Sequence, residues 1–329
     1  MASRWCVSSF SISVILGLAL ALVTTRAEAQ SAASEGCDDD ALSALAAVHA
    51  LDHVTPTELL ARARRDGASY PSLHVITLSD DDLAGRARWM RTLASRGLGP
   101  LVCGEALLET SRVVVAAPAQ GSLVIDGHAL RVTLSPRFAE PVVYVRSRDA
   151  EPRAYAVREG IAQIDLGEVE VPAQLQLVAT GPEGPRPVAE LRVGEGEVVD
   201  SLPEDPTVIT LLRARAESGP LRPNRLLAEV AEEHAERVCA TGHVAHEIAD
   251  EGNAEQRLRR AHVEARHVGE VVSRAADERG AWRALVASPS HRAALGDRRF
   301  TDVGVARVEH EGRTCLVVVL ASWPRRAAR

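Results

Sequence analysis

The pattern of apolar and polar positions changes twice along the chain, and these changes divide it into three predicted units. From about residue 37 to residue 117, segments with helical spacing mix with strand-like segments. Between residues 112 and 193, short β-rich runs alternate with Pro and Gly, which is typical of a small antiparallel β-sandwich. From about Asp205 onwards, amphipathic helices and apolar strands return. The pattern therefore predicts a multidomain α+β protein.

The boundaries between the units follow from the same pattern. Gly, Glu and Pro are concentrated between the second and third units, as in a linker. We expect an N-terminal α/β domain of unknown role over residues 30–117, a β-sandwich-like domain over 118–195, a linker over 196–204 and a C-terminal domain over 205–325.

The first 29 residues are typical of a secretory signal peptide. Arg4 supplies a basic start, residues 14–23 are apolar, and the sequence Ala-Glu-Ala ending at Ala29 is a small-x-small cleavage site. The apolar run is shorter than a membrane-spanning helix needs, although a retained anchor is the alternative interpretation. No later run in the sequence approaches transmembrane length. We therefore expect a secreted, periplasmic or extracellular protein without a stable membrane span.

Composition narrows the range of partners. The 329 residues carry a formal net charge of −7, so an exported chain of this kind is not an obvious binder of nucleic acid or anionic membranes. All 38 basic residues are arginine, which excludes chemistry that needs a lysine.

Four cysteines remain when Cys6 is removed with the signal peptide. An even number of cysteines behind an export signal predicts disulfides, and four cysteines allow three pairings. We favour Cys37–Cys103 and Cys239–Cys315, because each pair then lies within one predicted domain. Free buried thiols are the alternative, and thiolate metal binding is disfavoured because no close C-x-x-C pair occurs.

The C-terminal domain contains a predicted helix with a complete apolar stripe. Asn224 is its expected N-cap and Gly242 its expected end. His234 falls on the stripe, so we predict a buried structural histidine rather than a ligand. Residues 303–308 and 314–320 predict a hairpin whose second strand is central in a sheet, because it is apolar on both faces.

Three residues with the chemistry of a site follow on separate predicted elements. His246 lies in a polar connection, Glu270 lies in a strand, and His291 lies on a helical turn. Ser288 is the predicted cap of that turn, with proline at its first helical position. Two imidazoles beside one carboxylate suit a metal ion, a proton relay or the polar head of a ligand.

Five short motifs follow one another in this domain. They are AEEHA at 231–235, AH at 245–246, GEV at 269–271, SPSHR at 288–292 and FTDVGVA at 300–306. In this order they resemble the A-x-x-H-A, S-H, G-E-N, S-P-G-H-R and F-x-x-V/I-G-V-G motifs of the CAP superfamily of cysteine-rich secretory proteins, antigen 5 and pathogenesis-related proteins. The resemblance covers residues 205–322 and none of the preceding part of the chain.

The resemblance implies an α-β-α sandwich, of the CAP or SCP-like type, with a cleft lined by His246, Glu270 and His291. Two positions depart from the family pattern. Leu285 stands where many members have a second acidic residue, and Val271 replaces the asparagine after the cleft glutamate. Both departures remove polar groups, which weighs against a tight four-ligand metal site.

Three functions remain open for this cleft. The favoured one is a secreted binding module for a small-molecule, lipid or extracellular protein ligand. A divalent cation such as zinc, held by His246, Glu270 and His291, would be its one candidate cofactor. The alternative is a metal-assisted hydrolase or peptidase in which one histidine is the general base. The third is a hydrogen-bonded cluster with a purely structural role.

Overall fold

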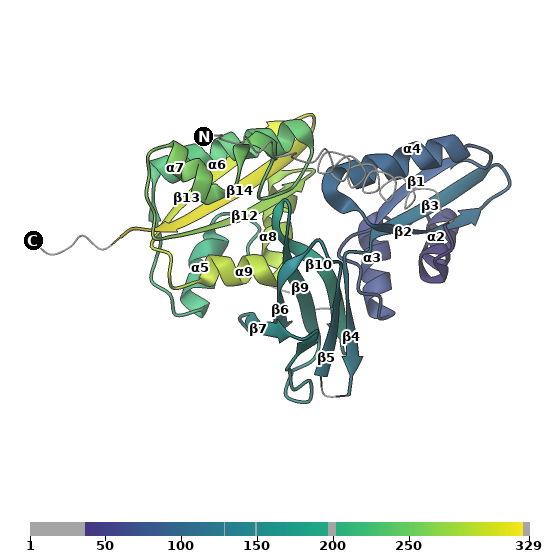
Figure 1. Cartoon of the computed structure of the whole chain (residues 1–329), viewed down its shortest axis with the longest axis horizontal. Coiled ribbons are helices and arrows are strands. Elements are labelled where there is room, and N and C mark those ends of the chain that lie inside the picture. The colour runs from purple at the N-terminus through teal and green to yellow at the C-terminus, as the bar shows by residue number, and fades with distance from the viewer. Residues whose placement is uncertain (1–36, 128, 149, 197–201, 325–329) are drawn as a thin grey trace, which may run out of the picture.

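The structure, a computed structural model, describes residues 37–127, 129–148, 150–196 and 202–324 (Figure 1). The predicted signal peptide at residues 1–29 lies outside the described residues, as does part of the predicted linker. Three sheets, of three, seven and four strands, divide the described chain. The seven-stranded sheet lies between two mixed α/β units, which confirms the predicted multidomain α+β class. Within the described ranges, no helix is both long and apolar enough to cross a membrane.

The N-terminal unit is a three-stranded antiparallel sheet, in the order β1-β3-β2, covered by helices on both faces. Asp39 caps its first helix, because the Asp39 side chain accepts a hydrogen bond from the Leu42 amide at 2.9 Å. Its elements are the helices α2 (Asp40–Asp52), α3 (Pro56–Arg65) and α4 (Leu83–Leu93), the π-helical turn η1 (Ala94–Leu98) and the strands β1 (His74–Ser79), β2 (Leu101–Leu107) and β3 (Ser111–Pro118).

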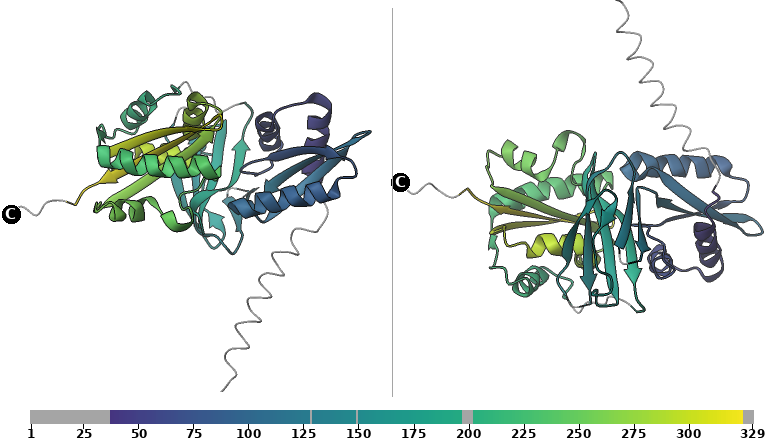
Figure 2. Two further views of the ribbon diagram at one scale, coloured as in Figure 1. Left: turned by 90° about the horizontal axis from the view of Figure 1, so that it is seen from above. Right: turned by 60° about the horizontal axis from the view of Figure 1, so that its bottom comes forward.

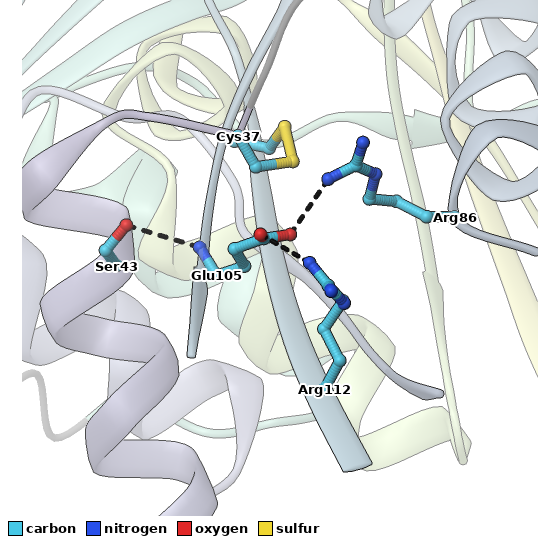
Figure 3. The surroundings of a disulfide bond; sticks show 6 residues. Cys37, Ser43, Arg86, Glu105 and Arg112 are labelled. Carbon is cyan, nitrogen blue, oxygen red and sulfur yellow. Dashed lines mark hydrogen bonds and ion pairs between the residues drawn. A yellow bond between two sulfur atoms is a disulfide. The ribbon is translucent and has the colours of Figure 1, made fainter. Parts of the chain in front are cut away.

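The predicted Cys37–Cys103 disulfide closes this unit (Figure 3). Beside it, the Glu105 carboxylate forms ion pairs with Arg112 and, at 2.9 Å, with Arg86. The disulfide fastens the start of the described chain to strand β2, and the ion pairs join β2 to α4 and β3.

The middle unit is one curled sheet with the strand order β10-β9-β6-β7-β8-β5-β4. Its first and last strands, β10 and β4, also pack against each other, so the sheet encloses a single apolar core. The predicted sandwich is therefore one continuous sheet, because β7 pairs with both β6 and β8. The strands are β4 (Gly121–Asp126), β5 (Ala129–Leu134), β6 (Ala139–Ser147), β7 (Arg153–Arg158), β8 (Ile161–Ala162), β9 (Ala173–Gly181) and β10 (Gly184–Val193).

The C-terminal unit is an α-β-α sandwich around a four-stranded sheet in the order β11-β13-β14-β12 (Figures 1 and 2). Helix α6 packs on one face, and α5, α8 and α9 pack on the other. Strand β14 is central and almost wholly buried, as its apolar sequence predicts. The helices are α5 (Thr207–Arg215), α6 (Arg225–Thr241), η2 (Ala249–Glu251), α7 (Ala254–Arg260), α8 (Glu278–Ala287) and α9 (Pro289–Gly296), and the strands are β11 (Arg222–Pro223), β12 (His267–Ala275), β13 (Asp302–His310) and β14 (Arg313–Ser322).

Helix α6 follows its sequence signals closely. Asn224 caps it by accepting hydrogen bonds from two backbone amides, and Gly242 ends it in the left-handed conformation. The predicted second disulfide, Cys239–Cys315, joins α6 to β14 across the core. Both predicted cysteine pairs are thus confirmed.

Candidate functional site

A cleft of about 580 Å³ opens where the C-terminal unit meets the middle sheet. The C-terminal unit provides most of its lining, and the middle unit provides one side through Tyr144, Ala154 and Pro185. The other lining residues are His246, Asn253, Ala254, Glu255, Val268, Gly269, Glu270, Ser290, Ala293, Ala294, Asp297, Arg299 and Phe300.

Glu270 is the buried acid of this site. It lies on β12, where its neighbours Val271 and Val272 belong to the cores on opposite faces of the sheet. Because side chains alternate along a strand, Glu270 faces the same side as Val272, towards α6. Its side chain is only 4% exposed, so its carboxylate depends on partners within the protein.

Three basic side chains surround the Glu270 carboxylate. His246 Nδ1 lies 2.9 Å from Oε1, Arg257 pairs with Oε2, and His234 Nε2 lies 3.7 Å from Oε1. Burial alone would raise the pKa of Glu270, but the hydrogen bond from His246 and the nearby positive charges lower the pKa below its ordinary value. Glu270 is therefore an ionised acceptor, and His246 Nδ1 carries the proton between them.

His246 lies in the loop that follows α6. The left-handed Gly242 ends the helix and allows the chain to turn back towards the sheet. Arg257 holds this loop, because its guanidinium donates to the backbone oxygens of His246 and Gly252, at 3.2 and 2.6 Å. The imidazole of His246 is 20% exposed and lines the cleft.

His234 is the structural histidine that its place on the apolar stripe predicts. Its ring is fully buried, with Nδ1 2.9 Å from Glu251 Oε2 and Nε2 2.9 Å from the Ala245 oxygen. It therefore links α6, η2 and the loop that carries His246.

The sequence reasoning missed Arg257 and Glu251, which complete this network. A signal for Arg257 exists in the sequence. It falls on the same helical face as Ala254 and Leu258, both of which are buried. A charged residue on the apolar stripe of a short helix indicates a buried ionic partner.

His291 is placed differently from the other two predicted site residues. It lies on α9 with Nδ1 buried and without a hydrogen-bond partner, and it is not among the residues that line the cleft. Burial, reinforced by the nearby His246, lowers the pKa of His291 to about 3, so its ring is neutral. Within the described part of the chain, no hydrogen bond joins it to His246 or Glu270.

The predicted cap of α9 is correct in position and wrong in its hydrogen bond. Ser288 occupies the N-cap position, but its hydroxyl makes no capping hydrogen bond. Instead, it donates to Gln176 Oε1 of strand β9 at 3.1 Å. The reason is tertiary, because the middle sheet packs directly on the start of this helix.

The side chains as arranged do not fit the cation that the sequence suggested. Among the described residues, no group of three or more His, Cys, Asp or Glu side chains could hold a metal ion. One Glu270 oxygen is also taken by Arg257, whose positive charge opposes binding of a cation beside it. The arrangement of His246, Glu270 and His291 therefore does not fit a metal ion.

Comparisons with known proteins agree with the C-terminal fold. The model of the cysteine-rich secretory protein family, CAP, matches residues 207–321. A comparison with curated proteins finds no match.

Similar solved structures include three bacterial proteins, each at a TM-score below 0.5. An outer surface protein of Borrelia burgdorferi is 20% identical, with 35% of this chain and 87% of that chain covered and a TM-score of 0.33. An extracellular protein containing an SCP domain from Bacillus anthracis is 17% identical, with coverages of 62% and 67% and a TM-score of 0.33. A cysteine-rich secretory protein from Staphylococcus aureus is 9% identical, with coverages of 61% and 84% and a TM-score of 0.28. With its α-β-α layers and the family match, the segment 207–321 is a CAP domain of the cysteine-rich secretory protein family.

Proposed function

We propose that this chain is an exported CAP-domain protein that binds a small, uncharged, hydrogen-bonding ligand in the cleft beside His246. The observation that carries the proposal is the cleft itself. Its volume of about 580 Å³ is that of a small-molecule site, and its lining combines apolar side chains with a few polar groups.

His246 supplies the polar group best prepared for a ligand. Its Nδ1 is committed to Glu270, which fixes the orientation and the tautomer of the ring. The other ring nitrogen, Nε2, is then a hydrogen-bond acceptor on a side chain that lines the cleft. A ligand hydroxyl or amide N–H is the matching donor.

The charges of the cleft favour an uncharged ligand. Each carboxylate in its lining already has an arginine partner. These pairs are Glu270 with Arg257, Glu255 with Arg259 at 2.5 Å, and Asp297 with Arg299 at 2.6 Å. The lining therefore offers no unpaired carboxylate to attract a cationic ligand. Its one arginine among the described residues, Arg299, is paired with Asp297, which reduces its attraction for an anionic ligand.

Export is supported by the sequence and by the cysteines. The first 29 residues have the pattern of a cleaved signal, and both disulfides fit an oxidising compartment.

A binding role is favoured over hydrolysis. Both oxygens of Glu270 are bound and its pKa is lowered, so it is a weak general base near neutral pH. The structural-cluster interpretation applies to Glu270, Arg257 and His234, whose side chains are buried. His246 is the end of this cluster that reaches the cleft.

Ligand-observed NMR on the exported protein tests this proposal. The probes are a panel of monosaccharides, N-acetylated amino-acid amides and short diols. At least one probe is expected to bind the unmodified protein, and His246→Gln is expected to weaken that binding about tenfold, the effect of losing one hydrogen bond. His310→Gln is the matched control, because His310 is exposed at the tip of the β13–β14 hairpin. Absence of binding by every probe, or equal binding by His246→Gln, would contradict the proposal.

A further inference from the structure

We infer that the middle unit is a fixed wall of the CAP cleft, in which Tyr144 and Pro185 contact the bound small molecule and keep larger molecules out. This step rests on the small-ligand function proposed above and assigns the residues that limit ligand size. Both residues line the cleft from the side opposite the CAP domain, on strands β6 and β10. Strands β6 and β9 of this unit lie beside α9 (Figure 1).

The first contact that fixes the wall is made by Gln176 of β9. Its side chain is buried, and its Oε1 accepts hydrogen bonds from the Ser288 hydroxyl and the Ser290 amide, both at 3.1 Å. Ser290 is itself a cleft residue. One buried amide of the middle sheet therefore holds the start of α9 at the edge of the cleft.

Two buried arginines make further contacts across the same junction. Arg146 of β6 donates to the Val286 oxygen of α8 at 3.3 Å, and Arg292 of α9 lies 3.6 Å from Glu151 of the middle unit. Buried charged side chains that contact polar groups of the other unit indicate a specific interface between the two units. The two units are thus joined by matched polar groups on both sides.

The turn between β9 and β10 packs directly against the loop of His246. Glu183 Oε2 lies 3.0 Å from His243 Nε2, and the Glu183 oxygen accepts from the Glu247 amide at 3.1 Å. Gly184 has φ of +87°, and a Cβ added to it would lie 2.9 Å from His246 Cβ. The turn therefore packs against the Cβ of His246, at a distance that only glycine allows.

The N-terminal unit supports this turn in its own right. Arg186 donates to the Gly97 oxygen at 2.8 Å and pairs with Glu183 at 2.7 Å. A chain of contacts therefore runs from the N-terminal unit through Arg186 and Glu183 to His243. This arrangement gives both preceding units a role, because they hold the wall in place against the CAP domain.

A thiol-accessibility experiment tests the wall without any ligand. The four cysteines that follow the predicted signal are paired, so Ser290→Cys places a single free thiol in the cleft. Ser95→Cys is the control, because Ser95 is exposed on the N-terminal unit. Each variant is treated with a small maleimide and with a maleimide that carries a long polyethylene glycol chain.

The wall predicts that the ratio of large-reagent to small-reagent rates is at least tenfold lower for Ser290→Cys than for Ser95→Cys. Adding Tyr144→Ala to Ser290→Cys is expected to raise this ratio at least threefold. Equal ratios for the two single variants, or no response to Tyr144→Ala, would overturn the inference while leaving the proposed function standing.

A second test of the inference measures the affinity of a probe. The probe that binds best in the NMR panel is expected to lose about tenfold in affinity in Tyr144→Ala. Tyr155→Ala is the control, because Tyr155 packs against the core of the middle unit and does not line the cleft. Unchanged affinity in Tyr144→Ala, together with weakened binding in His246→Gln, would show a CAP site without a contributing wall.

Discussion

The two α/β units that flank the curled sheet share three structural features, but only in the CAP domain do any of these features border the cleft beside His246. Each unit has a disulfide that closes a segment of similar length, 66 and 76 residues, an arginine paired with a buried glutamate, and a helix that begins with a capping box. The pairs are Arg64 of the N-terminal unit with Glu190, and Arg257 of the CAP domain with Glu270. The capping boxes are Thr55–Glu58 and Asn253–Gln256.

The two ion pairs differ in what surrounds them. Glu190 belongs to strand β10 of the middle unit, so its pairing with Arg64 at 2.8 Å joins two units. Glu270 and Arg257 belong to one domain, and their pair borders a cleft through His246. A buried ion pair is therefore no sign of function by itself. The Arg257–Glu270 pair differs from the Arg64–Glu190 pair because an open cleft and a partly exposed imidazole lie beside it.

The largest expected effect compares the two arginines. Arg257→Met is expected to lower the free energy of unfolding by about 3–5 kcal/mol, because it leaves the Glu270 carboxylate buried without its cation. Arg64→Met is expected to cost about 1–3 kcal/mol. Each glutamate keeps one side-chain donor, Gln174 or His246, but Arg257→Met also releases the backbone oxygens of the His246 loop. Arg64 is also 12% exposed, whereas Arg257 is fully buried. Urea unfolding followed by circular dichroism measures both values.

The exposed Arg259→Met is the control for this comparison, with an expected change within about 0.5 kcal/mol. Equal losses of stability for Arg257→Met and Arg64→Met would mean that Glu270 depends on its arginine no more than Glu190 does.

A smaller effect is expected from acid, and it compares a histidine in each unit. Burial lowers the pKa of His291 to about 3, against an ordinary value of 6.5, and burial beside Arg96 lowers the pKa of His74. The unfolded chain therefore binds more protons than the folded chain below pH 6.5, so stability is complete above that pH and falls as the pH decreases. For His291 the loss between pH 6.5 and 5 is on the order of 2 kcal/mol.

Thermal unfolding of His291→Gln and His74→Gln across this pH range measures both contributions. Each variant is expected to lose less stability than the unmodified protein on acidification. Glu270 does not interfere, because its lowered pKa makes its contribution disappear only below its ordinary value of 4.5. If His291→Gln and the unmodified protein lose the same stability on acidification, folding does not lower the pKa of this histidine.

Much of the fold follows from local sequence signals. The apolar stripe of α6, the caps at Asn224 and Gly242, and the doubly apolar run of β14 each determine an element through neighbours in the chain. The two disulfides followed from domain membership. These features were predictable because their causes lie within one predicted element or one domain.

The candidate site was only partly predictable. The sequence indicated His246 and Glu270, which the structure places in direct contact. It did not indicate Gln176 or Tyr144, because nothing in the β-rich segment shows that its strands pack against the CAP domain. Contacts between units depend on the docking of complete sheets and helices, which local spacing does not encode.

The smallest expected effect on stability comes from the helix N-caps, one in each of the two units. Thr55→Ala and Asn253→Ala each remove an N-cap and are expected to cost about 1 kcal/mol of stability. Asn253 also lines the cleft, so Asn253→Asp separates the two roles. Aspartate caps a helix as well as asparagine does, so stability is expected to stay within about 0.5 kcal/mol. Probe binding is expected to weaken severalfold, because the amide becomes a carboxylate. Unchanged probe binding in Asn253→Asp would mean that the Asn253 capping box, like that of Thr55, contributes only to stability.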